Sequence, residues 1–180
     1  MRIIRDTHFI DPENRGGVAA IGNFDGVHLG HQAVIDIARA EATRRGVPLG
    51  IMTFEPHPRN FFAPATPAFR LMNAEAKANR LDKLGVERLF EVPFNKALAE
   101  LDARAFAQTV ICDQLGLDHV VVGQDFCFGK GRSGNAETLK AFGAEMGFGV
   151  TIAQMVALDA GEVSSTNIRA ALADGRPRVA

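Results

Sequence analysis

The chain has 180 residues, of which 47% are hydrophobic and 23% charged, the composition of an ordinary globular protein with one domain. Its formal net charge of −1 provides no broad basic surface, which argues against binding to nucleic acid or to an anionic membrane. No apolar run approaches the roughly 20 residues that cross a bilayer, and no signal-peptide segment follows the N-terminus. We therefore expect a cytoplasmic protein, with no obligatory protein partner evident.

The chain contains two cysteines, Cys112 and Cys127. They do not form a C-x-x-C pair, so their spacing indicates neither a zinc site nor a disulfide framework. We expect two buried, reduced thiols, as in a reducing compartment.

Apolar runs that are typical of buried parallel strands alternate with helical patterns along the chain. Helices are indicated by apolar residues at spacings of three and four, between a capping residue and a glycine. In chain order we predict a strand over 18–24, a helix over 31–45, a strand over 48–54, a proline-rich loop over 55–73, a helix over 74–84, a strand over 88–93, a helix from Asp102 to about Leu115, a strand over 119–123, a helix from Asn135 to about Met146, a strand over 150–156, and a helix capped by Ser164 or Ser165 that ends at Leu172. This alternation predicts an α/β fold with an open, mostly parallel, Rossmann-like sheet and helices on both faces.

Ligands of such sheets bind beyond the carboxyl ends of the strands, where the strand order reverses. The loop after the first strand, residues 22–31, has the sequence G-N-F-D-G-V-H-L-G-H. His28 and His31 can donate ring N–H groups to phosphate oxygens, and His31 falls at a predicted helix start, which favours an anion. Gly30 leaves room for a base or phosphate to approach closely. Spacing alone leaves two alternatives open, a metal site that includes Asp25 and a pair of ordinary loop histidines.

The loop after the second strand begins T-F-E-P-H-P-R at residues 53–59 and continues with further phenylalanines and prolines. Phe54, Phe61 and Phe62 could form a rigid apolar wall for a flat ring that stacks on aromatic side chains. Packing of these residues in the core is the alternative. We select Phe62 as the ring contact.

Two further loops have unusual sequences. Residues 123–134, G-Q-D-F-C-F-G-K-G-R-S-G, contain G-x-G-x-x-G, but this dinucleotide fingerprint belongs in a first strand-to-helix turn. We interpret the segment as a mobile basic loop with Lys130 and Arg132 that contacts phosphate or is simply solvated. Residues 163–169, V-S-S-T-N-I-R, place hydroxyls at a helix start and Arg169 one turn inside, which suits an anion. Ordinary helix capping is the alternative.

Together these segments resemble the H-x-G-H nucleotidyltransferases, specifically the FMN adenylyltransferase (FAD synthetase) module of the bacterial bifunctional riboflavin kinase/FAD synthetases. The likeness covers nearly the whole chain, including T-F-x-P-H-P, G-x-[DN]-F-x-F-G-x-x-R-x-G and I-S-S-T-x-x-R, with Val163 in place of the usual isoleucine. The resemblance implies a nucleotidyltransferase fold, transfer of AMP from ATP to FMN, and Mg²⁺ bridging the phosphates. The catalytic residues we expect on this basis are His28, His31, Ser164 and Arg169. The nucleotide and flavin contacts we expect are Gly22, Asn23, Phe24, Gly30, Phe62, Gly123, Asp125, Phe128, Ser165 and Thr166; no metal ligand is assigned.

The expected mechanism depends on two helix starts that hold one triphosphate across the carboxyl edge of the sheet. Transfer of an adenylyl or cytidylyl group to another phosphate acceptor is an alternative, as is a non-catalytic flavin- or nucleotide-binding module. The Phe-rich loop and the F-x-F segment favour the flavin. We expect residues 1–180 to form one FMN adenylyltransferase domain that lacks the riboflavin kinase domain and binds small-molecule nucleotides, with no nucleic-acid or membrane partner.

Overall fold

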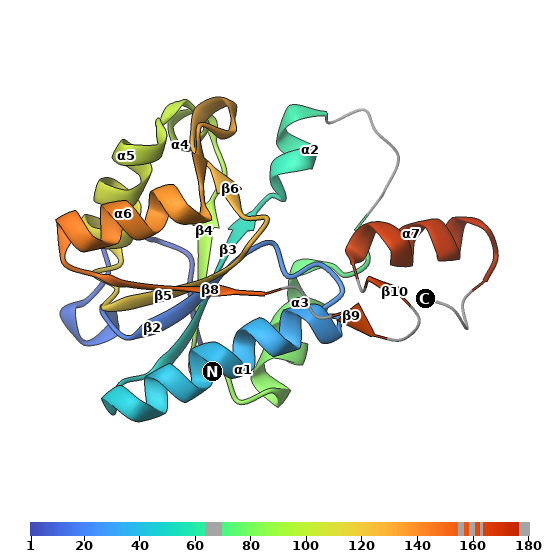
Figure 1. Ribbon diagram of the computed structural model, residues 1–180, viewed down its shortest axis with the longest axis horizontal. Helices are drawn as coiled ribbons and strands as arrows, with labels where there is room; N and C mark the ends of the chain where they lie inside the picture. Colours follow the sequence, from blue (N-terminus) through green and yellow to red (C-terminus); the bar gives the residue numbers. More distant parts are fainter. Residues whose placement is uncertain (64–69, 155–156, 159–160, 163, 177–180) are drawn as a thin grey trace.

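A parallel sheet forms the centre of the computed structural model, which describes residues 1–63, 70–154, 157–158, 161–162 and 164–176 (Figure 1). Six strands follow the order β1-β4-β3-β2-β5-β8, and each neighbouring pair is parallel. The strands are β1 (Arg2–Ile4), β2 (Val18–Ile21), β3 (Leu49–Glu55), β4 (Arg88–Pro93), β5 (His119–Gly123) and β8 (Gly149–Ala153). The order reverses between β2 and β5, so a ligand crevice is expected at the carboxyl ends of these two strands.

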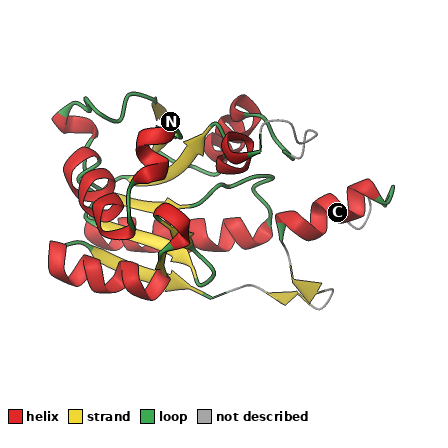
Figure 2. Cartoon of the chain, turned by 90° about the horizontal axis from the view of Figure 1, so that it is seen from above, coloured by secondary structure: helices red, strands yellow, loops and turns green. Residues whose placement is uncertain are grey.

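Helices cover both faces of the sheet (Figures 1 and 2). They are α1 (Leu29–Arg45), α2 (Pro58–Phe62), α3 (Ala74–Lys83), α4 (Lys96–Glu100), α5 (Ala103–Phe106), the π-helical segment η2 (Ala107–Gln114), α6 (Ala136–Met146) and α7 (Ser165–Ala173), with short 3₁₀ turns η1 (Pro12–Asn14) and η3 (Lys130–Arg132). One core cluster includes residues of α1 and α3, and the other includes residues of α5, η2 and α6. Along β2, Ala19 and Ile21 face the second of these clusters, whereas Val18 and Ala20 face the first. The α/β prediction is confirmed.

Several element boundaries differ from the sequence prediction. The strand predicted over 18–24 ends at Ile21, because the chain turns through Phe24, whose φ is +49°. The helix predicted from His31 begins at Leu29, because the side chain of His28 caps it. The strands predicted over 88–93 and 119–123 match β4 and β5, whereas the boundaries of β3 and β8 shift by one to three residues. Residues 155–156 of the strand predicted over 150–156 lie outside the described part of the chain.

The loop predicted over 55–73 contains a short helix, so this prediction was wrong in part. The imidazole Nδ1 of His57 accepts a hydrogen bond from the Arg59 amide at 3.1 Å and caps α2. Pro58 occupies the first helical turn, where its fixed φ and missing N–H are favourable. Residues 64–69 lie outside the described structure.

Besides α2 and the 3₁₀ turns η1 and η3, other small features were not predicted. They are the edge strand β1, the helix α4, the paired strands β6 (Cys127–Phe128) and β7 (Gly134–Asn135), and the paired strands β9 (Ala157–Leu158) and β10 (Gly161–Glu162). Each is five residues or shorter. Such segments are too short for an apolar period to develop in the sequence.

The helix predicted from Asp102 to about Leu115 is present, but its second part is π-helical. Asp102 caps it by accepting a hydrogen bond from the Ala105 amide at 2.8 Å. The Leu115 amide donates to the carbonyl of Val110, five residues earlier, at 3.0 Å. A spacing of apolar residues does not distinguish this wider hydrogen-bonding pattern from an α-helix.

The two cysteines are free thiols, but both are half-buried, so the expectation of burial was wrong. Cys127 lies on the two-residue strand β6, whose hairpin borders an open cavity. Among the described helices, none is both long and apolar enough to cross a lipid bilayer.

Candidate active site

A cavity of about 900 Å³ opens at the carboxyl ends of β2, β3, β5 and β8. It lies at the predicted position, where the strand order reverses. All fourteen residues assigned from the sequence line it: His28, His31, Ser164, Arg169, Gly22, Asn23, Phe24, Gly30, Phe62, Gly123, Asp125, Phe128, Ser165 and Thr166. The fold therefore brings together segments that are far apart in the chain, such as Asp25 and Arg169, which are 144 residues apart and hydrogen-bonded.

The histidine loop, defined here as residues 22–31, carries two stacked imidazoles. The ring centroids of His28 and His31 are 3.7 Å apart with an interplanar angle of 18°. His28 Nδ1 accepts a hydrogen bond from the backbone amide of His31 at 3.3 Å. A neutral His28 therefore carries its proton on Nε2 and can donate it to a ligand.

Both histidines are neutral near pH 7. Burial lowers the pKa of His31 to about 3, and the neighbouring His28 adds to this effect. Burial also lowers the pKa of His28, although Asp25 opposes the shift. Among the described residues, the buried Nδ1 of His31 has no hydrogen-bond partner.

The backbone of the histidine loop is strained and tightly held. Phe24 and Val27 adopt positive φ values of 49° and 41°, a region that side chains other than glycine rarely occupy. Both side chains are only 1% exposed. The carbonyl of Val27 accepts a hydrogen bond from the Gln32 amide group at 2.9 Å. Packing and hydrogen bonds thus maintain a conformation that the isolated segment would not favour.

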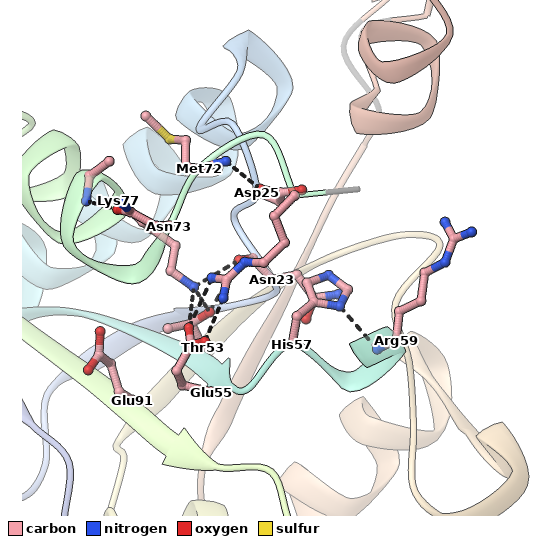
Figure 3. A network of polar contacts seen from close by, with 12 residues as sticks. Asn23, Asp25, Thr53, Glu55, His57, Arg59, Met72, Asn73, Lys77 and Glu91 are labelled. Atoms are coloured by element: carbon pink, nitrogen blue, oxygen red, sulfur yellow. Dashed lines mark hydrogen bonds and ion pairs between the residues drawn. The ribbon is translucent and has the colours of Figure 1, made fainter. Parts of the chain in front are cut away.

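Asp25 connects the histidine loop to two other segments, and Figure 3 shows its contact with Met72 in the first of them. Its carboxylate accepts hydrogen bonds from the amides of Leu71, at 2.9 Å, and Met72, at 3.1 Å. The guanidinium of Arg169 lies 2.6 Å from Oδ2. Burial would raise the pKa of Asp25, but the bonds from Arg169, Leu71 and Met72 outweigh it and hold the pKa below its usual value. The carboxylate is therefore ionised.

The start of α7 faces the histidine loop. Ser164 caps the helix, with its Oγ accepting from the Asn167 amide at 3.2 Å, and Ser165 Oγ donates to the Asp25 carbonyl at 2.9 Å. The capping alternative is thus realised for Ser164, although the residue also lines the cavity. Arg169 lies in the cavity wall while it pairs with Asp25.

Aromatic side chains form another part of the cavity wall. Phe62 is 68% exposed, and its ring meets that of Phe94 edge-on at 5.7 Å. Phe128 is buried and stacks on Phe126, with a centroid separation of 5.4 Å and an angle of 15°. An exposed phenylalanine ring at a cavity mouth provides an apolar surface on which a flat ring can stack.

The basic loop predicted from residues 123–134 is the β6–β7 hairpin with the turn η3. At Gly129, φ is +75° and a Cβ would lie 2.6 Å from the Ala103 nitrogen, so the backbone passes directly over the start of α5. Lys130 forms an exposed ion pair with Glu100. The glycines thus serve a tight hairpin, not a strand-to-helix turn, in agreement with the interpretation that this is no dinucleotide fingerprint.

Sequence reasoning missed a polar layer beneath the histidine loop (Figure 3). Lys77 is 2% exposed, and its Nζ lies 3.0 Å from Thr53 Oγ1, 3.4 Å from the Asn23 carbonyl and 3.7 Å from Glu55. Arg70 forms a two-point ion pair with Glu55 at 2.6 and 3.0 Å. The position of Lys77 on the apolar side of the 74–84 helix was a signal that could have identified it.

The sequence matches the model of the FAD synthetase family over residues 10–167. A bifunctional riboflavin kinase/FMN adenylyltransferase of Pseudomonas fluorescens is 45% identical over 96% of this chain and 55% of that protein. The enzymes with the same name from Escherichia coli K12 and Bacillus subtilis are 37% and 35% identical, over 97% of this chain and 56% and 55% of theirs. The chain spans about half the length of the curated relatives it matches.

Solved structures have the same fold. A structure described as a macrolide-efflux protein from Streptococcus pneumoniae superposes with a TM-score of 0.83 and 28% identity, over 98% of this chain and 57% of that one. Pantoate-beta-alanine ligase from Francisella tularensis superposes with a TM-score of 0.55 and 12% identity, over 93% of this chain and 72% of that one. The second likeness concerns the fold alone.

Proposed function

The chain belongs to the FAD synthetase family, and from that premise we propose that it transfers the adenylyl group of ATP to FMN, giving FAD and pyrophosphate. One observation supports this proposal most: the starts of α1 and α7 meet at a single cavity that also has an aromatic wall. A helix start suits a phosphate, and the aromatic wall suits an isoalloxazine.

In the proposed reaction an oxygen of the FMN phosphate attacks the α-phosphorus of ATP in line. A new P–O bond forms, the bond from the α-phosphorus to the oxygen bridging to the β-phosphate breaks, and pyrophosphate leaves with that electron pair. No side chain acts as a nucleophile. Catalysis then consists of positioning the two phosphates and stabilising the charge that develops on them.

We propose that His28, His31 and Arg169 stabilise this developing charge. The Nε2–H of His28 would donate to a phosphate oxygen, and the stacked His31 lies in the first turn of α1 beside Gly30. Thr166 is exposed at the start of α7 and lines the same cavity. Ser164 caps α7 and Ser165 is hydrogen-bonded to Asp25. We therefore propose that both serines position the start of α7.

For the flavin, Phe62 and Phe128 are the proposed contacts, and the phosphate of FMN would point toward the histidine loop. Asp125 lines the cavity beside Gly123, where a Cβ would lie 2.9 Å from its Oδ1. The absence of a side chain at Gly123 therefore leaves room for the Asp125 carboxylate to lie against the end of β5.

We also propose that Mg²⁺ takes part, held mainly by the substrate phosphates. Among the described residues no three His, Cys, Asp or Glu side chains form a metal-binding group. Of the described carboxylates in the cavity wall, Asp25 is already bonded to Arg169 and two amides, which leaves Asp125 as the candidate ligand. Such a site fits Mg²⁺, which commonly uses one or two carboxylates together with phosphates and water. When bound, the ion would offset phosphate charge.

The reaction is tested by incubating the chain with ATP, MgCl₂ and one acceptor at a time, and separating the products by chromatography. We expect FAD and pyrophosphate with FMN, and no product with riboflavin, pantetheine phosphate or nicotinate mononucleotide. Adenylylation of another acceptor alone would identify a different transferase, and FMN binding without turnover would identify a binding module. The cytoplasmic location stays a prediction.

A further inference from the structure

Asp25 is the one residue of the histidine loop whose polar groups reach both the 70–73 segment and α7 in the described structure. Two backbone amides and the Arg169 guanidinium meet its carboxylate, and the Ser165 hydroxyl meets its carbonyl. The Asp25 side chain is 4% exposed and that of Arg169 is 22% exposed. Hydrogen bonds between charged partners at such partly buried positions are stronger than those at the surface.

The apolar attachment of α7 is weak by comparison. Of its residues, Ala171 alone is buried, and neither core cluster of the described residues includes a residue of α7. Leu172 is 47% exposed. Both views show α7 projecting from the sheet and its covering helices (Figures 1 and 2). Because apolar burial contributes little here, polar contacts supply a larger share of the free energy that holds α7 in position.

We infer that Asp25 is a positioning residue for the nucleotide, because it tethers α7 to the histidine loop and so fixes the distance between the two helix starts. This inference rests on the proposed function. The tether acts at two points, through the ion pair with Arg169 and the hydrogen bond from Ser165, which lie about one helical turn apart on α7. Two such points fix both the position and the direction of the helix.

The 70–73 segment connects Asp25 to the helix α3. Leu71 and Met72 donate their amides to Asp25, and Asn73 then caps α3 by accepting from the Ala76 amide at 2.7 Å. Asp25 is therefore connected through a short segment to a helix that packs in the core through Ala78 and Leu81. Movement of α7 relative to the sheet requires that the bonds to Asp25 stretch or break.

The test is hydrogen exchange of backbone amides, followed by mass spectrometry, in Asp25→Asn. Asparagine keeps an oxygen for the amides of Leu71 and Met72 but places an uncharged group against Arg169. We expect exchange over residues 165–173 to become roughly tenfold faster or more, with exchange in β2 and β5 unchanged. The KM for ATP should rise roughly tenfold, while the KM for FMN stays within about twofold.

Asp174→Asn is the matched control, because it makes the same substitution in an Arg-paired aspartate just beyond α7. That pair is exposed, so exchange over 165–173 and both KM values should stay within about twofold of the wild type. Unchanged exchange in Asp25→Asn would overturn the inference. An equal increase in all strands would also overturn it, because Asp25 would then support the fold generally.

Should Asp25→Asn fail to fold, Arg169→Gln breaks the same ion pair and leaves the Leu71 and Met72 bonds in place. Exchange over 165–173 must then increase in Arg169→Gln, and unchanged exchange would contradict the inference. The exchange experiment does not depend on activity. If the wild-type chain makes no FAD while these variants loosen α7, the proposed function fails and the tether stands.

Discussion

The stacked imidazoles of His28 and His31 are central to the proposed chemistry. In the free protein burial keeps both neutral near pH 7, so the two imidazoles contribute N–H donors and add no positive charge to that of Arg169. We expect each imidazole to gain charge only when an anion binds beside it. In the proposed function the histidine loop can therefore bind a triphosphate without the repulsion that two charged imidazoles in stacking contact would cause.

Replacing either histidine should lower turnover without unfolding the chain. His28→Ala or His31→Ala removes one donor, and by comparison with oxyanion donors we expect a loss of about 2–4 kcal/mol of transition-state stabilisation, roughly thirtyfold to nine-hundredfold in kcat. The control is His8→Ala, which alters an exposed histidine outside the cavity and should leave kcat within about twofold. Near-normal kcat in both site variants, measured as FAD formed per unit time, would remove the histidines from the mechanism.

ATP binding should be accompanied by proton uptake. The groups around His31 that affect its charge are His28, Asp25, Arg169 and Lys77, and an incoming triphosphate adds negative charge that raises the pKa values of both imidazoles. The complex then binds more protons than the free protein, so the affinity for ATP should increase as the pH falls from about 8 to about 6.

Calorimetric titrations in two buffers of different ionisation enthalpy measure this uptake. Uptake should decrease when His28 and His31 are both replaced by alanine. An identical binding enthalpy in both buffers, for the wild-type protein, would show that the histidines do not change protonation.

Among the secondary-structure elements, the long and buried ones could be predicted from the sequence. Short elements, and those that depend on contacts with distant residues, could not. The predicted bounds of β4 and β5 match, and α6 lies within the predicted limits, because buried parallel strands and capped amphipathic helices leave local patterns. The three-residue strand β1 depends on pairing with β4, more than 80 residues later. The helix α2 depends on an imidazole cap, which residue preferences for capping do not include.

The candidate site was also predictable only in part. The fourteen residues assigned from motifs that are continuous in the sequence all line the cavity, but so do others that were not assigned, such as Asp25, His57 and Phe94. Asp25 was considered only as a possible metal ligand, because Arg169, its partner, is 144 residues away. Lys77 likewise meets Thr53 and Asn23 only after folding. Contacts between distant segments leave no local pattern, so the polar layer beneath the histidine loop could be identified only from the structure.

The support that α3 gives to the histidine loop can be tested at Lys77. In Lys77→Ala, the Thr53 hydroxyl, the Asn23 carbonyl and Glu55 lose a buried donor, and we expect the free energy of unfolding to fall by about 3 kcal/mol. Lys77→Met keeps most of the volume and separates the effect of the cavity from that of the lost hydrogen bonds. Lys83→Ala, at an exposed position of the same helix, is the control and should change stability by less than about 0.5 kcal/mol.

Urea unfolding of these variants measures the difference directly. A loss below about 1 kcal/mol in Lys77→Ala would mean that the buried ammonium does not stabilise the histidine loop. Both variants should lose less in kcat than in stability relative to the wild type, because Lys77 contacts the backbone of the histidine loop and does not itself line the cavity.

In the molecule as a whole, one sheet edge gathers the histidine loop, the aromatic wall, the β6–β7 hairpin and the start of α7 around one cavity. Parallel strands make this possible, since their carboxyl ends all lie at the same edge and the reversal of order opens a crevice there. Asp25 then joins two of these segments through Arg169 and Ser165. The proposed joining of ATP to FMN requires one cavity for a nucleoside triphosphate and a flat ring, and this cavity of about 900 Å³ is lined by two helix starts and an aromatic wall.

The most direct test of adenylyl transfer follows the phosphorus atoms of ATP. The chain is incubated with FMN, MgCl₂ and ATP labelled at either the α- or the γ-phosphate, and the products are separated by chromatography. The account predicts that the α-label appears in FAD and the γ-label in pyrophosphate. A γ-label transferred to the flavin, or an α-label that remains in ATP while FMN is bound, would contradict it.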